Sequence, residues 1–442
     1  MRPKVLCVGH GTIERNSGGV EVYQRIIAER LAPQFEFLFF APDLHSNEKG
    51  NYLLYSLESD LRENYRPSPQ VRADHFSHPD LERILLGITK EHRISLVHFH
   101  HLIRQVPNLI LACNSRGIPT VFSVHDYYAI CDEYNLLNFE GRYCGVFENG
   151  FQKCDSCLYL KARHKFGSQK LRHEKFSEAL LATDRLIFNT EGGRSNLKGI
   201  FPLLEDSKLR VVGAPSGTKF KSADQRPQDG PLRVLIPNGL SRLKGGETLR
   251  ELVRLTQGMP IEYHFFGKSE REFSEEEIRV LNDQVHFHGH YTREFLSEFS
   301  SSIHLSIHAS IWPETFCISL SEMWDLGVVP IASNIGALSE RIRDGENGFL
   351  VPPGDSQQLK ELLALLLKDR TKIERIRAGF QAPLGTSAEE CSIQIRQLYE
   401  EVLKSRPPPK STPQSMTAPG SWSTGRGPKS QWLRRKMIGF LK

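Results

Sequence analysis

The chain lacks any long uninterrupted hydrophobic stretch. Of its 442 residues 39% are apolar and 25% charged, and no apolar run reaches the roughly 18 residues that a membrane-spanning helix needs. A signal-peptide layout is also missing, because the N-terminal MRPKVLCVGHG enters a strand-like run at once. We therefore expect a cytoplasmic protein of ordinary globular composition that is too long for a single core.

Acidic residues are absent from the last part of the chain. Between Ser405 and Lys442 there are eight Lys or Arg and no Asp or Glu, whereas the rest of the chain carries 49 basic and 52 acidic residues. The body is therefore slightly acidic, and its charge offers no support for nucleic-acid binding. We expect no nucleic-acid partner.

Short apolar strands alternate with helical segments, which is typical of parallel α/β sheets. Strands are expected in the first half at Lys4–Val8, Phe35–Phe40, Leu96–His100, Thr120–Val124 and Arg185–Asn189. Strands are expected in the second half at Leu232–Pro237, Ile261–Phe266, Val285–Gly289, Ile303–His308 and Val328–Ser333. The polar break Ser222–Pro231 predicts an interdomain linker. Two doubly wound domains, residues 1–224 and 231–404, should face a central cleft that holds the ligand.

The C-terminal residues divide into a linker and a basic tail. Residues 405–429 have the Pro, Ser and Gly content of a disordered linker. In residues 430–442 a helix would gather apolar side chains on one face beside Arg434 and Arg435. We expect this short helix to hold the protein reversibly at the inner face of a membrane. Docking onto a partner protein, or simple disorder, is the alternative interpretation.

Two glutamates bracket an apolar run in the segment PETFCISLSEMW. If a helix starts near Cys317, Glu314 lies in the loop before its N-terminus and Glu322 lies inside it. The first turn of such a helix, around Phe316, Cys317 and Ile318, presents unpaired N–H groups to an anion. The carboxylates can accept charge-assisted hydrogen bonds from hydroxyl groups. A nucleotide sugar offers such a combination of diphosphate, ribose diol and sugar hydroxyls.

The same segment resembles the family 4 glycosyltransferases, retaining enzymes of the GT-B fold. The resemblance rests on Pro313–Phe316, the spacing of Glu314 and Glu322, the run Gly336–Glu340 and the run Asp344–Asp355. It implies that Glu314 binds hydroxyls of the donor sugar and Glu322 binds the ribose. Gly336 and Ala337 would let a second backbone turn approach the diphosphate. A simple strand-to-helix turn is the other interpretation of that glycine.

The family stabilises its leaving diphosphate with positive side chains and without a metal ion. The corresponding motif here is Asn238–Gly245, in which Lys244 falls in register. Gly239 occupies the usual arginine position, so we expect Arg242 to supply the missing charge. The alternative is that both cations are merely solvated. No cofactor is expected for catalysis.

The N-terminal half adds residues that should face the donor sugar or the acceptor. His125 follows the strand Thr120–Val124, where the resemblance implies a histidine facing the sugar. Gly18 and Gly19 follow the first strand and can form a backbone cradle near the diphosphate. A dinucleotide-binding fingerprint is excluded, because Glu14 stands where its third glycine should be. A structural histidine is the default alternative for His125.

Four of the eight cysteines fall in an insertion at residues 126–160. They are Cys131, Cys144, Cys154 and Cys157. The Cys-x-x-Cys pair has metal-ligand spacing, and two further thiols would complete a tetrahedral site. We predict a structural zinc ion that orders this insertion; unpaired structural thiols are the alternative.

These observations predict a retaining glycosyltransferase. The enzyme would move a sugar from a UDP- or GDP-sugar to a saccharide or lipid-linked acceptor in polysaccharide or glycolipid assembly. A nucleotide-sugar epimerase on the same fold, or a non-catalytic relative acting as a scaffold, remains as an alternative.

Overall fold

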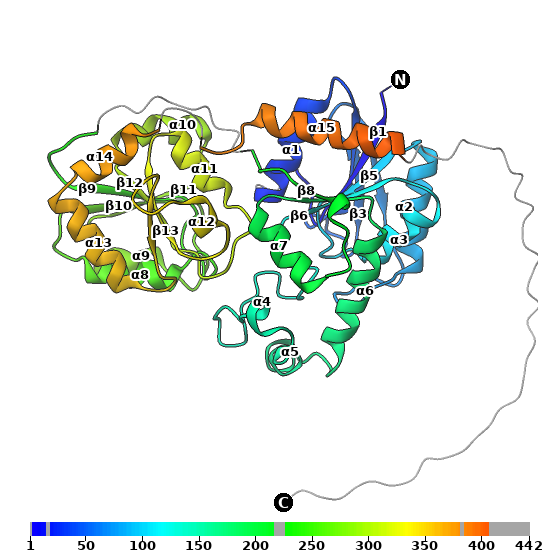
Figure 1. Cartoon of the computed structure of the whole chain (residues 1–442), viewed down its shortest axis with the longest axis horizontal. Helices are drawn as coiled ribbons and strands as arrows, with labels where there is room; N and C mark the ends of the chain where they lie inside the picture. The colour runs from blue at the N-terminus through cyan, green and yellow to red at the C-terminus, as the bar shows by residue number, and fades with distance from the viewer. Residues whose placement is uncertain (1, 15–17, 216–225, 381–383, 406–442) are drawn as a thin grey trace, which may run out of the picture. The chain divides into compact units, whose positions relative to one another are not determined.

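The computed structural model describes residues 2–14, 18–215, 226–380 and 384–405. Within these residues the strands form one sheet of eight and one of six (Figure 1). All ten strands predicted from the sequence are present, with bounds that shift by no more than two residues. The expectation of two successive parallel α/β sheets is therefore confirmed.

The first sheet has the strand order β4-β3-β2-β1-β5-β6-β7-β8. All neighbours pair in parallel except β3, which is antiparallel to both β2 and β4. Its strands are β1 (Lys4–Val8), β2 (Glu36–Pro42), β3 (Tyr52–Ser56), β4 (Arg62–Tyr65), β5 (Leu96–Phe99), β6 (Thr120–Val124), β7 (Arg185–Phe188) and β8 (Leu209–Val211). The central strands are nearly all apolar because helices cover both faces of a parallel sheet.

The helices of this half connect and cover the parallel strands. They are α1 (Gly19–Leu31), α2 (Pro79–Glu91), α3 (Asn108–Ser115), α4 (Val146–Asn149), α5 (Cys154–Ala162), α6 (Ser168–Ala182), α7 (Glu191–Ile200) and the 3₁₀ turn η1 (Asp206–Lys208). Local signals fix several starts. The Thr190 hydroxyl accepts from the N–H of Gly193 at the start of α7, and Pro79 occupies the first turn of α2. The short helices α4 and α5 lie within the cysteine-bearing insertion.

The second sheet has the order β11-β10-β9-β12-β13-β14, and all its neighbours pair in parallel. Its strands are β9 (Leu232–Ile236), β10 (Ile261–Phe266), β11 (Val285–Gly289), β12 (Leu305–His308), β13 (Val329–Ser333) and β14 (Phe349–Val351). Its helices are α8 (Gly246–Leu255), α9 (Glu275–Leu281), α10 (Arg293–Phe299), η2 (Ser300–Ser302), α11 (Ile318–Asp325), α12 (Gly336–Arg341), α13 (Ser356–Lys368) and α14 (Thr371–Ala378). Ligands of such sheets bind beyond the carboxyl ends of the strands.

The last helix, α15 (Ala388–Ser405), returns to the first sheet. Its buried side chains Ile395, Leu398 and Tyr399 join a core cluster with residues of β1, β2 and α1. Figure 1 shows this helix lying beside α1. The predicted second domain, residues 231–404, includes nearly all of α15, whereas this helix packs in the core of the first sheet. The reason is that an amphipathic stripe shows only that a helix must be covered, and not by which sheet.

The tail and most of the predicted linker cannot be compared with the structure. Residues 405–429 and 430–442 lie outside the described residues except for Ser405, which ends α15, and residues 222–225 of the interdomain break lie outside as well. Among the described helices, none combines the length and the apolar character needed to cross a bilayer.

Candidate active site

The loop between β12 and α11 carries the first of the two predicted glutamates. Helix α11 begins at Ile318, directly after its N-cap Cys317, so the predicted helix start is confirmed. Cys317 has a left-handed backbone with φ of 67°, which non-glycine residues rarely adopt unless their surroundings hold them. Glu314 consequently lies in the loop before the helix, and Glu322 lies within the helix.

Glu314 is a buried carboxylate held by two side chains. The Lys244 ammonium donates to its Oε2 atom at 2.7 Å, and the Ser310 hydroxyl donates to Oε1. Burial alone would raise the pKa of Glu314, but the charge and hydrogen bond of Lys244, together with the Ser310 hydroxyl and His308, outweigh burial, and the pKa is lowered. Burial would lower the pKa of Lys244, and the Glu314 carboxylate reverses this and raises it. Both groups are therefore charged, with only 5% of Glu314 exposed.

Arg341 holds the end of this loop in place. Its Nη1 atom donates to the carbonyl oxygens of Phe316 at 2.8 Å and Cys317 at 3.0 Å. Its guanidinium also lies over the Phe316 ring, 3.8 Å from the centroid. Burial lowers the pKa of Arg341 to about 10, so it stays charged at neutral pH. Arg341, which is partly buried, therefore supports the strained start of α11.

Gly336 and Ala337 support the same loop from the other side. The Ala337 N–H donates to the Glu314 carbonyl oxygen at 2.8 Å. A Cβ atom at Gly336, where φ is 56°, would lie 2.6 Å from the backbone of Pro313. Neither residue lines the two cavities described below. The glycine is therefore needed for close packing against the loop, and the predicted approach of this turn to a diphosphate stays a prediction.

A cavity of about 670 Å³, the first cavity, opens beside Glu314 and is lined from both halves of the chain. Eight of the predicted site residues line it: Gly18, Gly19, His125, Lys244, Glu314, Phe316, Cys317 and Ile318. The two halves also meet here, because the Thr315 hydroxyl donates to the His125 carbonyl oxygen at 2.5 Å. The structure thus brings together residues that are as much as 300 positions apart in the chain, such as Gly18 and Ile318.

The N-terminal face of the first cavity is rich in histidine. Burial lowers the pKa of His125 to about 4, so its ring is neutral at neutral pH. His101 Nε2 lies 2.6 Å from the Asp126 carboxylate, and His10 Nε2 lies 3.4 Å from Glu21. No role was predicted from the sequence for His10, Glu21, His101 or Asp126. One signal was available, since His101 follows β5 as His125 follows β6, and both strands end at the same sheet edge.

A second cavity of about 600 Å³ contains Glu322. It shares Gly19, Asn238, Ile318 and Ser319 with the first cavity. The two cavities therefore meet at the first turn of α11, with Glu314 lining one and Glu322 lining the other. An elongated ligand can contact both carboxylates from this position.

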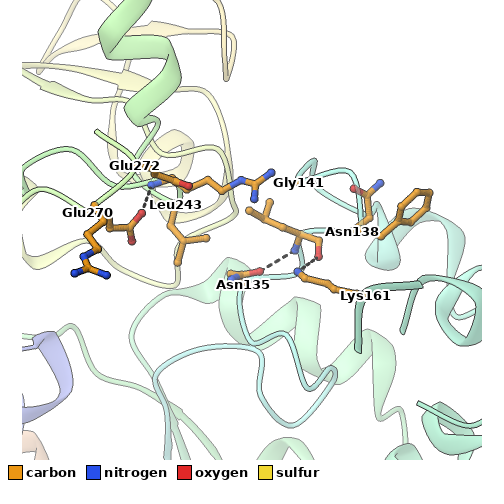
Figure 2. A pocket seen from close by; sticks show the side chains of 11 residues that line it. Asn135, Asn138, Gly141, Lys161, Leu243, Glu270 and Glu272 are labelled. Carbon is orange, nitrogen blue, oxygen red and sulfur yellow. Dashed lines mark hydrogen bonds between the residues drawn. The ribbon is translucent and has the colours of Figure 1, made fainter. Parts of the chain in front are cut away.

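Arg242 lines neither of these cavities. It lines a third cavity of about 490 Å³, formed by the cysteine-bearing insertion and the loop Glu270–Glu272. Figure 2 shows Asn135, Asn138 and Lys161 on one side of this cavity and Leu243, Glu270 and Glu272 on the other. A Cβ atom at Gly141 would lie 2.6 Å from the Arg242 guanidinium, so the side chain reaches the insertion. The predicted placement of Arg242 at a diphosphate is therefore not supported.

Lys268 is a better-placed cation that the sequence analysis missed. It follows β10 and lines the second cavity together with Glu322. Its backbone packs on Gly239, where a Cβ atom would lie 2.7 Å from the Lys268 carbonyl oxygen and φ is 63°. This contact explains why no arginine stands at position 239. Lys268 follows β10, whereas the motif that contains Lys244 follows β9. No local sequence pattern indicates that a cation after β10 reaches the same site.

The four cysteines of the insertion are free thiols in the structure. Burial raises the pKa of Cys131 and of Cys154 to about 12, so these thiols are neutral in the absence of a metal ion. In the part of the chain that the structure describes, no three His, Cys, Asp or Glu side chains are grouped so as to hold a metal ion. The structure does not test the zinc site, which stays a prediction.

Comparison with known proteins identifies the family. Residues 17–214 match the family described as Glycosyltransferase Family 4, and residues 218–381 match the family described as Glycosyl transferases group 1. The two matches together cover every strand of both sheets except β1. The chain belongs to the family 4 glycosyltransferases. This agrees with the resemblance stated from the residues around Glu314 and Glu322.

Individual relatives of this glycosyltransferase are distant. Phosphatidyl-myo-inositol mannosyltransferase of Mycobacterium leprae is 38% identical over 93 residues, which are 21% of this chain and 25% of that protein. The match thus spans about a quarter of that relative's length. Sucrose-phosphate synthase from Thermosynechococcus elongatus is 20% identical, with a TM-score of 0.66, over 92% of this chain and 100% of that one. HepE from Anabaena in complex with UDP is 15% identical, with a TM-score of 0.62, over 90% of this chain and 100% of that one. The structural matches confirm the GT-B fold.

Replacing Lys244 by methionine should destabilise the glycosyltransferase by about 3 kcal/mol at neutral pH, because it leaves a buried carboxylate without its partner. We take the lower end of the range for such pairs, since the Lys244 side chain is 28% exposed. In the variant, burial raises the folded-state pKa of Glu314 above its unfolded value. Stability is then greatest at acidic pH and is lost as the pH rises.

Urea unfolding at mildly acidic and at neutral pH measures both effects. Arg242→Met is the matched control: the residue is exposed, and its change should cost less than about 0.5 kcal/mol. Equal stability of the two variants at neutral pH would show that the Lys244–Glu314 pair is not a buried ion pair.

The zinc prediction is tested by elemental analysis of protein purified without chelators. One tetrahedral site takes one ion, so we expect about one zinc per chain. Cys154→Ser should lose the metal, whereas Cys113→Ser, at a buried cysteine outside the insertion, should keep it. Metal-free protein with unchanged thermal stability refutes the site and leaves unpaired thiols.

Proposed function

We propose that this family 4 glycosyltransferase transfers a sugar, with retention of anomeric configuration, from a nucleotide-sugar donor to a saccharide or lipid-linked saccharide. The donor is a UDP- or GDP-sugar, and the reaction belongs to polysaccharide, lipopolysaccharide or glycolipid assembly. One observation carries the proposal: two joined cavities place a buried, charged Glu314 and the helical Glu322 on either side of the start of α11.

The donor is proposed to lie across both cavities. Its ribose diol donates to Glu322 in the second cavity, and the hydroxyls of its sugar donate to Glu314 in the first. The diphosphate then lies at the N-terminus of α11, where backbone N–H groups favour an anion. Lys244 and Lys268 approach this point from the two cavities and stabilise the charge that develops on the leaving diphosphate.

The transfer step follows from this arrangement. The acceptor hydroxyl attacks the anomeric carbon from the face that the diphosphate leaves. Its oxygen forms the new glycosidic bond while the bond to the diphosphate breaks, and its proton passes to an oxygen of the leaving phosphate. The products are the glycoside and a nucleoside diphosphate. Neutral His125 contributes a hydrogen bond to the sugar or the acceptor. We propose that no metal ion is required, since the lysines carry the countercharge.

The relatives support this choice of substrates. The HepE structure contains UDP, which favours a uridine nucleotide as the donor. The mannosyltransferase of Mycobacterium leprae is named for transfer to a phosphatidyl-inositol, which favours a lipid-bearing acceptor. We accordingly propose that the protein works on the cytoplasmic side of a membrane. The basic residues 430–442 are proposed as one contact with that membrane, with a partner protein as the alternative.

The function is tested by incubating the full chain with UDP-, GDP- and ADP-sugars and measuring nucleotide release with and without saccharide acceptors. We expect one donor to give acceptor-dependent release, because transfer needs the attacking hydroxyl. NMR of the first product should show the donor's anomeric configuration, and chelator should leave the rate unchanged.

Four results would contradict the proposal. An inverted product excludes retention, and activity lost on chelation and restored by magnesium or manganese excludes metal independence. If none of the acceptors tried changes the rate of nucleotide release, the result points to an epimerase or hydrolase. No release with any donor points to a non-catalytic relative.

Replacing Glu314 and replacing Glu322 should have different kinetic effects. Glu322→Ala removes a ribose contact and should raise the KM for the donor, whereas Glu314→Ala removes a contact to the reacting sugar and should mainly lower kcat. Each lost charge-assisted hydrogen bond should cost about 1.5–3 kcal/mol. Steady-state kinetics measures both, with Arg242→Ala as a matched control that should keep the donor KM. Wild-type kinetics in both glutamate variants would remove the assignment.

A further inference from the structure

The segment Leu158–Arg172, which we name the α5–α6 surface, gathers exposed apolar side chains. It covers the end of α5, the following turn and the start of α6. Its large apolar residues with the fractions exposed are Tyr159 43%, Leu160 51%, Phe166 67% and Leu171 44%. Single exposed apolar residues are common, whereas four within one short segment are not.

The α5–α6 surface is also strongly basic. Its sequence LYLKARHKFGSQKLR contains five Lys or Arg and no Asp or Glu, although the chain before Ser405 has an acidic balance. Arg172 is buried, where it donates to the Tyr128 carbonyl oxygen and lies 3.6 Å from Asp132. Of the other four cations, Arg163, Lys165 and Lys170 are exposed, whereas Lys161 pairs with the Glu133 carboxylate at 3.0 Å. The surface thus combines exposed cations with exposed apolar groups.

These side chains form one patch. The rings of Tyr159 and Phe166 are 5.8 Å apart, and the Arg163 guanidinium lies 5.2 Å from the Tyr159 ring centroid. Phe166 and Leu171 line a groove of about 930 Å³ together with Arg163 and Lys165. Figure 1 shows α5 beside the start of α6, so the two helices present this patch together.

The fold itself does not need these apolar groups. Helix α6 packs against the first core through Phe176, Ala179 and Leu180, which are buried one to two turns later. Helix α5 buries Leu158, whereas its next two residues point to solvent. Exposing Phe166 gives no folding energy, because burial of apolar surface is what stabilises a core.

We propose that the α5–α6 surface binds the protein to membranes that contain anionic lipids. An interfacial anchor requires apolar side chains that enter the acyl boundary, an aromatic ring at the interface and cations at the head groups. The segment supplies all three and itself contains no Asp or Glu, although Asp74 and Asp132 line the same groove. Lys161 also lines the cavity of Figure 2, so docking brings that cavity close to the head groups. This inference does not depend on the proposed sugar transfer, because lipid binding is measured without a donor.

The test is flotation with vesicles of phosphatidylcholine alone and of equal parts phosphatidylcholine and phosphatidylglycerol. It uses the full chain and a chain ending at Lys404, which keeps both sheets and nearly all of α15. We expect both chains to float with anionic vesicles only. Lys165→Gln and Lys170→Gln should each lower binding about fivefold, as expected for one cation near an anionic surface. Leu160→Ser with Phe166→Ser should lower it further.

The controls are Val280→Ser with Leu203→Ser for exposed apolar residues, and Arg375→Gln for an exposed cation. They should float as the wild type does, and all variants should keep the wild-type melting temperature. Failure of the chain ending at Lys404 to float with anionic vesicles overturns the proposal. The proposal is also overturned if the α5–α6 variants, made in the chain ending at Lys404, float as well as that chain does without substitutions. In either case the membrane contact is left to residues 430–442 or to a partner protein.

Discussion

The site depends on one buried ion pair, between Glu314 of the β12–α11 loop and Lys244 before α8. The carboxylate is 5% exposed and accepts the lysine ammonium at 2.7 Å, so it stays charged at a position where burial alone would favour its neutral form. A buried charge of this kind is tolerated only when it is paired and hydrogen-bonded. The pair therefore fixes a strong hydrogen-bond acceptor and a cation together, next to the N-terminus of α11. These are the groups that a sugar hydroxyl and a leaving phosphate require.

The loop that carries Glu314 is held by contacts from both sheets. Arg341 and Gly336 support it from within the second half, and Thr315 donates to the His125 carbonyl oxygen of the first half. Trp312 belongs to the core cluster of the first sheet, although the chain around it belongs to the second. Helix α15 likewise follows the second sheet in the chain but packs in the core of the first sheet. The position of the carboxylate thus depends on packing across both halves, which is how a site can be held rigid in a cleft.

Local sequence patterns were sufficient for part of this arrangement. The ten apolar runs identified ten strands, and the glutamate spacing placed Glu314 before α11 and Glu322 inside it, because both follow from period and helix-start signals. The errors concern groups whose neighbours are distant in sequence. Arg242 points to the insertion at Gly141, Gly336 packs on Pro313, and Lys268 reaches the second cavity from another strand. His10 and His101 of the first cavity were also missed, because their meeting depends on which strands are neighbours in the sheet. None of these contacts leaves a periodic signal.

The central claim is that one donor molecule spans both cavities across the start of α11. A crystal structure of the protein with UDP or its preferred UDP-sugar tests this most directly, by the position of the ribose and the diphosphate. The account predicts a ribose hydroxyl within hydrogen-bond distance of Glu322, the diphosphate at the first turn of α11 and the sugar beside Glu314. Nucleotide bound instead in the cavity of Arg242 and Glu270, with both glutamates free of ligand, would contradict it.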